Sequence, residues 1–167
     1  LKTARRTAPR AKEKSVDRTA IEELIYRSCL ALDAKDFKGY LALCDDAYNY
    51  KITAHSPEIR KDMIWLEHDK KGLQTLFTNL PRHNSDHAPV TRHVTVYTVE
   101  TGADGKQANV VSALQVFKTE LDGGATALFA VGRYHDTVKL DGEKPVLLTR
   151  TVKLETRQFG IGYHIPF

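Results

Sequence analysis

The chain has 167 residues, a formal net charge of +4 and only two cysteines. A chain of this length fits one domain, which buries enough surface to fold without a structural metal ion or disulfide bonds. No apolar run reaches the roughly 18 residues of a membrane-spanning helix, and the first residues lack the apolar stretch of a secretory signal. We therefore expect a cytoplasmic protein with no membrane partner.

Basic residues are concentrated at the start of the chain. Residues 1–18 hold seven Lys or Arg and two Asp or Glu, a net charge of +5, which leaves −1 for residues 19–167. With almost nothing to bury, 1–18 is predicted to be a flexible basic arm in front of a single domain over 19–167. No aromatic residues interleave its charges, as they do in surfaces that stack single-stranded nucleic acid. We expect no nucleic-acid partner and favour an arm that orders against a protein.

The first part of the domain predicts helices. Residues 19–22 have the spacing of a capping box, and the apolar spacing that follows predicts a helix over about 19–33. Asp36 can cap a second helix, whose apolar side at the 3–4 spacing holds Phe37, Tyr40, Leu41 and Cys44. Both cysteines, Cys29 and Cys44, then lie in helices, where a free thiol usually behaves as a small buried hydrophobe.

Two strands and a third helix are predicted next. Residues 48–52 alternate in the period of a strand, and the apolar run over 64–66 predicts a second strand at the edge of the sheet. Asp69 can cap a third helix that ends before Pro81. The loop over 81–89 is polar and closed by prolines, which favours irregular structure.

The second half of the chain predicts a β meander. Period-two patterns separated by turns rich in Gly and Asp predict four strands, over 90–100, 109–120, 125–140 and 146–156. Short links make neighbouring strands antiparallel, and helices followed by a meander favour an α+β roll over a βαβ sheet. Alternation in the last two strands places on one face Leu128, Ala130, Gly132 and Tyr134 of the first, and Val146, Leu148, Arg150, Val152 and Leu154 of the second.

The hairpin over 132–156 resembles the last strand pair of the cone-shaped α+β fold shared by ketosteroid isomerase, scytalone dehydratase and the small subunits of ring-hydroxylating oxygenases. Three motifs narrow the resemblance: DKKGL at 69–73, TRHV at 91–94 and RTVKL at 150–154. Over roughly 19–160 the chain resembles the β (small) subunits of Rieske-type ring-hydroxylating oxygenases. Within that family its pattern is most similar to the branch that acts on methanesulfonate-type substrates.

The resemblance implies a cone-shaped roll with about three N-terminal helices packed on a curved, mostly antiparallel sheet. It also implies a subunit without catalytic residues that trimerises and holds three large (α) subunits, an assembly of the type α3β3. The Rieske 2Fe-2S cluster and the mononuclear iron then belong to the large subunit, which hydroxylates an aromatic or small sulfonate-type substrate. The expected function of this chain is structural.

The residues agree with a chain that holds no metal or other cofactor. A Rieske centre needs two cysteines and two histidines in paired short spacings, and neither cysteine has a histidine within such reach. A mononuclear iron needs two histidines and one carboxylate, which His83, Asp86 and His87 could supply. Pro81 and Pro89 argue against the helix that would align these three side chains, so we favour a plain polar loop.

An alternative is a cofactor-independent isomerase or dehydratase, because the same fold carries such enzymes. Asp33 would act as the general base with Tyr50 or His93, and Tyr97 is a further candidate. The structural interpretation, which we favour, is that Asp33 helps to space two helices, Tyr50 packs as an amphipathic strand residue and His93 pairs locally with backbone.

Subunit contacts are predicted for the arginines of the last strands and for the tail. Arg133, Arg150 and Arg157 are candidates because arginine pairs bidentately with carboxylates at interfaces. Arg150 stands among apolar neighbours, which predicts a desolvated partner or, equally, an exposed edge pair. The tail from Phe159 to Phe167 alternates large apolar residues with Gly and His, so we expect a last strand that continues into a neighbouring subunit.

Overall fold

The computed structural model describes residues 17–82, 87–159 and 166–167. Most of the predicted basic arm, His83, Asp86 and the middle of the tail lie outside the described residues. The helices are α1 (Arg18–Asp33), α2 (Phe37–Ala42), α3 (Lys70–Asn79) and the short 3-10 helix η1 (Leu80–Arg82). The strands are β1 (Cys44–Ser56), β2 (Lys61–Asp69), β3 (Val90–Thr101), β4 (Gln107–Thr119), β5 (Thr126–Lys139) and β6 (Val146–Leu154).

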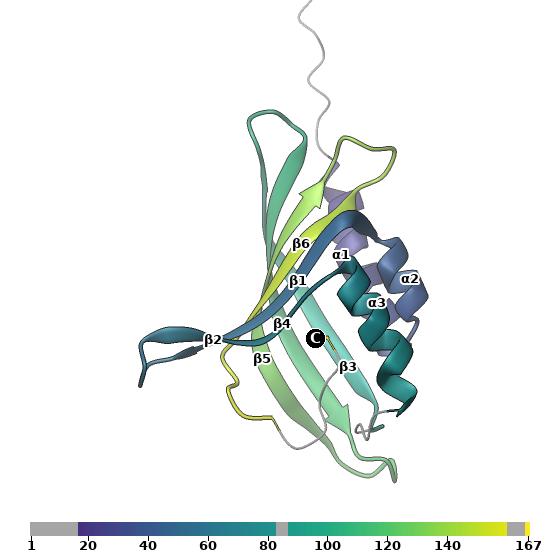
Figure 1. The fold of residues 1–167 in the computed structure, drawn as a ribbon, viewed down its shortest axis with the longest axis vertical. Helices are drawn as coiled ribbons and strands as arrows, with labels where there is room; N and C mark the ends of the chain where they lie inside the picture. The colour runs from purple at the N-terminus through teal and green to yellow at the C-terminus, as the bar shows by residue number, and fades with distance from the viewer. Residues whose placement is uncertain (1–16, 83–86, 160–165) are drawn as a thin grey trace, which may run out of the picture.

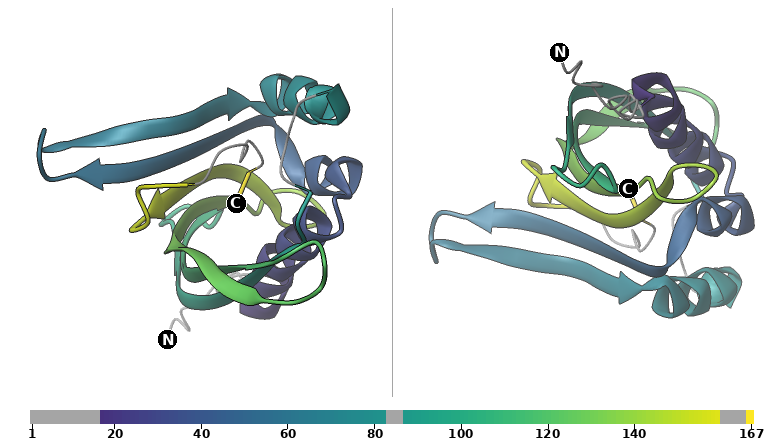
Figure 2. Two further views of the ribbon diagram at one scale, coloured as in Figure 1. Left: turned by 90° about the horizontal axis from the view of Figure 1, so that it is seen from below. Right: turned by 90° about the horizontal axis from the view of Figure 1, so that it is seen from above.

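The six strands form one curved sheet in the order β2-β1-β6-β5-β4-β3. All neighbours are antiparallel except β1 and β6, which run parallel. The sheet does not close, so β2 and β3 are its two edges. Figure 1 and Figure 2 show the three α-helices gathered along one side of this sheet, while the far end of the β1–β2 hairpin extends beyond it. The predicted α+β roll with a mostly antiparallel sheet is confirmed.

Aspartate caps begin all three α-helices. The predicted caps Asp36 and Asp69 are confirmed, since their carboxylates accept from the backbone N–H of Gly39 at 2.9 Å and of Gly72 at 2.7 Å. The expected capping box at 19–22 is wrong, because Asp17 accepts from two backbone N–H groups and starts α1 earlier. A carboxylate near the N-terminal N–H groups also offsets the positive end of the helix dipole.

Cys44 begins a strand and not the second helix that was predicted to contain it. α2 ends at Ala42, and the backbone N–H of Leu147 then donates to the carbonyl of Leu43 at 2.9 Å, where β1 begins to pair with β6. This pairing joins residues about a hundred positions apart, so it overrides a local helical pattern that the sequence supports only weakly. The thiol is buried all the same.

Bulges correct the predicted faces of the last two strands. The pairing register of β5 and β6 shifts between Thr137 and Val138, so Leu147 is fully buried and Leu148 is not. A second shift, between β4 and β5, leaves Leu128 54% exposed. An extra residue in one strand moves every side chain beyond it to the other face, which strict alternation cannot anticipate. The remaining residues of both predicted faces are buried, except Val146, which is partly exposed.

Side chains fill the space between the sheet and the helices. α1 contributes its predicted apolar stripe and Cys29 to this core. The strands contribute large side chains that have no exposed surface, including Tyr48, Tyr50, Tyr134 and Arg150. Tyr48 and Tyr40 share a hydrogen bond of 2.7 Å between their hydroxyl groups, which satisfies two polar atoms that burial would otherwise penalise.

Both thiols are expected to be unreactive in the folded protein. Burial raises the pKa of Cys44 to about 12 and also raises that of Cys29, and only a thiolate attacks disulfide reagents. At pH 8 the thiolate fraction of Cys44 is then on the order of one in ten thousand. Ellman's reagent should label two thiols per chain in denaturant and label the native chain at least about 100-fold more slowly. Immediate labelling of the native chain would contradict this burial.

Candidate functional site

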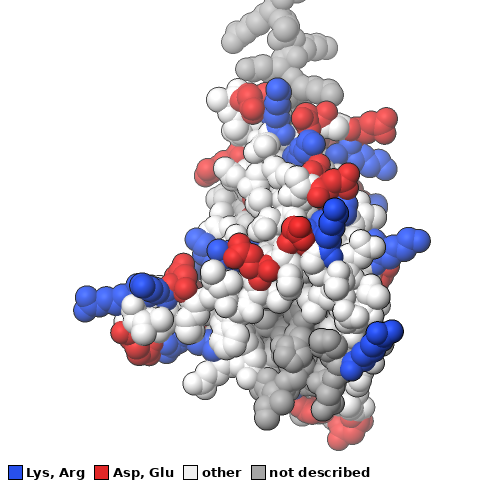
Figure 3. All heavy atoms as spheres, in the orientation of Figure 1, with Lys and Arg blue, Asp and Glu red and all other residues white. Residues whose placement is uncertain are grey.

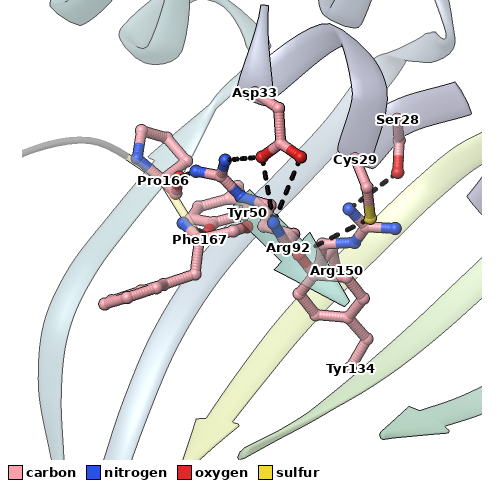
Figure 4. A network of polar contacts seen from close by, with 9 residues as sticks. All are labelled: Ser28, Cys29, Asp33, Tyr50, Arg92, Tyr134, Arg150, Pro166 and Phe167. Carbon is pink, nitrogen blue, oxygen red and sulfur yellow. Dashed lines mark hydrogen bonds and ion pairs between the residues drawn. The ribbon is translucent and has the colours of Figure 1, made fainter. Parts of the chain in front are cut away.

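A buried ion pair between Arg150 and Asp136 lies within the core, and Figure 4 shows its arginine beside Ser28 and Tyr134. Arg150 of β6 donates to both carboxylate oxygens of Asp136 of β5, from Nε at 2.8 Å and from Nη2 at 2.9 Å. Its Nη1 donates to the hydroxyl of Ser28 of α1 at 3.0 Å, and its guanidinium lies 3.9 Å from the ring centre of Tyr134. The pair therefore ties two strands to the helix that covers them.

This environment keeps the arginine charged. Burial opposes the charge, but the carboxylate of Asp136 and the hydrogen bonds to it hold the pKa of Arg150 well above its ordinary value. Neither side chain has any exposed surface. The planar guanidinium forms two parallel hydrogen bonds with the carboxylate. The pair therefore has a fixed geometry, and its burial keeps it from solvent.

A second group, which we call the Arg92 cluster, lies between α1, β3 and the end of the described chain. It contains Asp33, Tyr50, Arg92, Pro166 and Phe167. Asp33 accepts from the backbone N–H of Arg92 and from its Nη1, at 2.5 Å in the latter case. The Nη2 of Arg92 donates to the carbonyl of Pro166 at 2.7 Å. The side chain of Arg92 is 2% exposed and that of Asp33 20%.

Beside this cluster, α1, β3 and β4 border an open hollow of about 580 Å³. Three of the candidate catalytic residues of the enzyme alternative reach it, namely Asp33, His93 and Tyr97. Tyr50 is not among the residues that line the hollow. Tyr97 is 57% exposed, and the exposed His93 packs its ring 4.9 Å from that of Phe117. The structure thus brings part of the predicted set together, on the outside of the cone.

This arrangement is poorly suited to general-base chemistry. Asp33 accepts from two donors of a single arginine, the backbone N–H, which contacts both oxygens, and Nη1, so both carboxylate oxygens are already engaged. The hydroxyl of Tyr50 accepts from the backbone N–H of Phe167 at 2.8 Å and donates to the carbonyl of the same residue at 3.2 Å. Both side chains serve to hold the fold.

The predicted interface residues occupy different environments. Arg150 has the desolvated partner that the sequence predicts, but this is Asp136 of the same chain, so its prediction as a subunit contact is wrong. Phe167 is 1% exposed in the isolated chain, so little of it remains for a neighbour to contact. Arg133 is exposed, and Phe159 is partly buried, with its ring 5.4 Å from that of Trp65. For these two residues, contact with another subunit stays a prediction.

Arg157 contacts the turn between β1 and β2, where its Nη1 donates to Glu58 at 2.6 Å. This hydrogen bond, together with those from the backbone N–H of Glu58 and the hydroxyl of Ser56, lowers the pKa of Glu58 from 4.5 to about 2. A depressed carboxyl pKa means that the interaction is present above pH 4.5 and is lost as the pH falls through about 2. The carboxyl carbon signal of Glu58 in an NMR titration should have its midpoint near 2, and Arg157→Gln should return it toward 4.5. An unchanged midpoint in the variant would contradict this contact.

Sequence reasoning missed Asp136 and Arg92. Asp136 pairs directly with Arg150 in the β5–β6 register, so placing the hairpin in register would have revealed an acid opposite the buried arginine. Arg92 stands within the TRHV motif, and Arg150 opens the RTVKL motif. Two of the three motifs that carry the family resemblance therefore supply the two arginines that are buried among the described residues.

Among the described residues, no three His, Cys, Asp or Glu side chains gather closely enough to hold a metal ion. Of the three suggested iron ligands, His87 is described and exposed, and the other two fall in the segment 83–86 that is not described. Within the described part of the chain, no helix is long and apolar enough to cross a membrane.

Comparisons with known proteins give the family. A family model described as the ring hydroxylating β subunit matches residues 27–160. The chain is 41% identical over 154 residues to the β subunit of the methanesulfonate monooxygenase hydroxylase of Methylosulfonomonas methylovora, covering 88% of this chain and 85% of that protein. It is 30% identical over 151 residues to the β subunit of 2-aminobenzenesulfonate 2,3-dioxygenase of an Alcaligenes species, covering 90% and 99%.

A solved structure supports the same fold. It is the β subunit of an aromatic-ring-hydroxylating dioxygenase predicted in Novosphingobium aromaticivorans, with a TM-score of 0.77, 22% identity, and coverage of 90% of this chain and 96% of that one. The family model begins within α1 and extends past the end of β6, and two named β subunits align over most of their lengths. This chain therefore belongs to the family of ring-hydroxylating oxygenase β subunits.

Proposed function

We propose that the chain is a non-catalytic, structural subunit of a Rieske non-haem iron oxygenase, which assembles the large catalytic subunits. One observation carries this proposal: three buried or partly buried polar groups that could act as acids or bases are bound to other side chains or to backbone. Asp136 is held by Arg150, Asp33 by Arg92, and Tyr50 by residue 167. These contacts give a rigid body and leave little free chemistry inside it.

The partner in this proposal is the large (α) subunit. We infer that the chain forms a trimer that holds three large subunits, and that the Rieske cluster and mononuclear iron reside in those subunits. Both relatives are named for sulfonates, so the substrate proposed for the complex is a small or aromatic sulfonate. It would be recognised by the large subunit and not by this chain.

The surface carries exposed apolar side chains that suit such subunit contacts. Exposed large apolar side chains occur on the β1–β2 hairpin, at Ile59, Ile64 and Trp65, and beside the hollow, at Tyr26, Leu30 and Tyr97. Apolar groups of this kind favour protein interfaces over contact with water. On the face drawn in Figure 3, Lys and Arg are interspersed with Asp and Glu. A mixed pattern of charges suits a protein partner better than a polyanion.

Co-expression with a large (α) subunit of a ring-hydroxylating oxygenase tests the proposal. We expect the two chains to purify together at equal stoichiometry, with Rieske absorbance and iron in the complex, and neither in the β chain alone. Light scattering should show self-association of the β chain at micromolar concentration. Stoichiometric iron in the isolated chain would overturn the proposal. Isomerase or dehydratase turnover that Asp33→Asn abolishes would instead establish the alternative enzyme function.

A further inference from the structure

Pro166 and Phe167 lie beside Tyr50 of β1 and Arg92 of β3 (Figure 4), at a place that we call the mouth of the cone. Both are buried, and Phe167 is 1% exposed. Phe167 makes two backbone hydrogen bonds with the hydroxyl of Tyr50, and the carbonyl of Pro166 accepts from Arg92. The backbone of this dipeptide is thus bound by side chains of β1 and β3 that are far away in the sequence.

Aromatic rings hold the side chain of Phe167. Its ring centre is 5.2 Å from that of Phe159, which follows β6, and 6.2 Å from that of Phe129 of β5, with the latter pair nearly parallel at 28°. Phe159 and Phe129 are themselves 5.7 Å apart. Rings at these separations make favourable aromatic contacts. Phe129 and Phe159 therefore form a slot that the ring of Phe167 occupies, and another group can enter the slot only if that ring leaves it.

The polar groups around the slot are built to recognise a peptide. Tyr50 is 0% exposed and Arg92 is 7% exposed, and buried groups of this kind need hydrogen-bond partners. Asp33 fixes the guanidinium of Arg92, so that Nη2 points at a carbonyl of the bound segment. The site combines a fixed donor from Arg92, the hydroxyl of Tyr50, which both donates and accepts, and the aromatic slot. Together these groups match a phenylalanyl group with its preceding amide.

We propose that the mouth of the cone is a recognition site for a Pro-Phe peptide unit, which residues 166 and 167 occupy as an intramolecular plug. The site closes the interior of the cone and joins the end of the described chain to α1 through Arg92 and Asp33. The local concentration of a tethered segment is in the millimolar range or higher, so a free peptide does not compete with the plug in the native chain.

The single tryptophan of the chain gives a direct readout. Trp65 lies 5.4 Å from Phe159, which in turn contacts Phe167. In the full chain, Phe167→Asp places a charge where an apolar ring was buried, which expels the plug. Titration with N-acetyl-Pro-Phe-amide should then change the Trp65 fluorescence saturably, with an affinity at least about 10-fold higher than for the native chain. Adding Tyr50→Phe to this variant should weaken binding by about 10-fold, the value of one neutral hydrogen bond.

A second variant tests the aromatic half of the site if the first does not fold. Phe167→Ala deletes only the ring, and an apolar cavity of that size binds benzene-like molecules. Saturating toluene should raise the melting temperature of Phe167→Ala and leave that of the native chain unchanged. The proposal is overturned if the folded Phe167→Asp variant binds the peptide no better than the native chain, or if Tyr50→Phe has no effect on that binding. Failure of toluene to stabilise Phe167→Ala would equally reject the aromatic slot.

Discussion

Replacing Asp136 with Ala is expected to lower the free energy of unfolding of the isolated chain by about 3–5 kcal/mol. The reason is that Arg150 then remains charged and fully buried without its carboxylate partner. For a chain of this size, 1 kcal/mol corresponds to about 2–4 °C, so the melting temperature should fall by on the order of 10 °C. Denaturant unfolding followed by circular dichroism measures both quantities.

Two controls test whether the instability comes from leaving a buried charge without its partner and not simply from losing an ion pair. Glu155→Ala removes the exposed pair with Arg133, whose side chains are 55% and 73% exposed, and should cost less than about 1 kcal/mol. Asp136→Leu combined with Arg150→Met replaces the buried pair by apolar groups and should recover most of the loss. A double variant as unstable as the sum of its single variants would contradict the account, as would an Asp136→Ala chain that is stable alone and fails only in assembly.

Gly132→Ala is expected to lower the free energy of unfolding by about 1–3 kcal/mol, and Gly132→Val by more. Gly132 lies in β5 opposite Leu154 of β6. A Cβ at this position would clash with the carbonyl oxygen of Lys153 and approach the Cα of Leu154 to 3.0 Å. Because both obstacles are backbone atoms of the neighbouring strand, the two strands must separate before the methyl group fits.

The turn after β5 supplies the control for this substitution. A Cβ at Gly142 would have Lys144 O at 3.6 Å, an ordinary contact, and its backbone is outside the left-handed region. Gly142→Ala should change the stability by no more than about 0.5 kcal/mol. Equal stability of the two variants, measured by urea unfolding, would show that β5 and β6 are not as close as the structure has them.

Likeness to enzymes of the same architecture does not by itself assign proton chemistry to this chain. A cone of this kind needs an accessible acid or base to perform proton chemistry. Here Asp33 and Tyr50, which the sequence offers for that role, form hydrogen bonds with Arg92 and with residue 167. These hydrogen bonds favour the proposed structural role over proton chemistry, because the partners of a residue and not its type alone decide its role.

The sequence by itself determined the local structure and the family. Aspartates with N-terminal capping ability, apolar spacing in α1 and α3, and turns rich in Gly and Asp specify elements through contacts within a few residues. These signals do not depend on the rest of the molecule, so most elements were predicted within a few residues of their bounds. The three family motifs are equally local, and each falls at its expected place, opening α3, opening β3 and within β6.

Only the tertiary structure decided the contacts between distant segments. The parallel pairing of β1 with β6 removes Cys44 from a helix, and the bulges reverse the faces of Leu147 and Leu148. The sequence left open whether Arg150 had a desolvated partner or an exposed edge pair, and only the structure showed that Asp136 and Ser28 bind it within the chain. Such contacts depend on register and on burial, which change the energy of a charged group by several kcal/mol. A local pattern carries neither quantity, so the role of each buried arginine became clear only when the sheet and the helices were assembled.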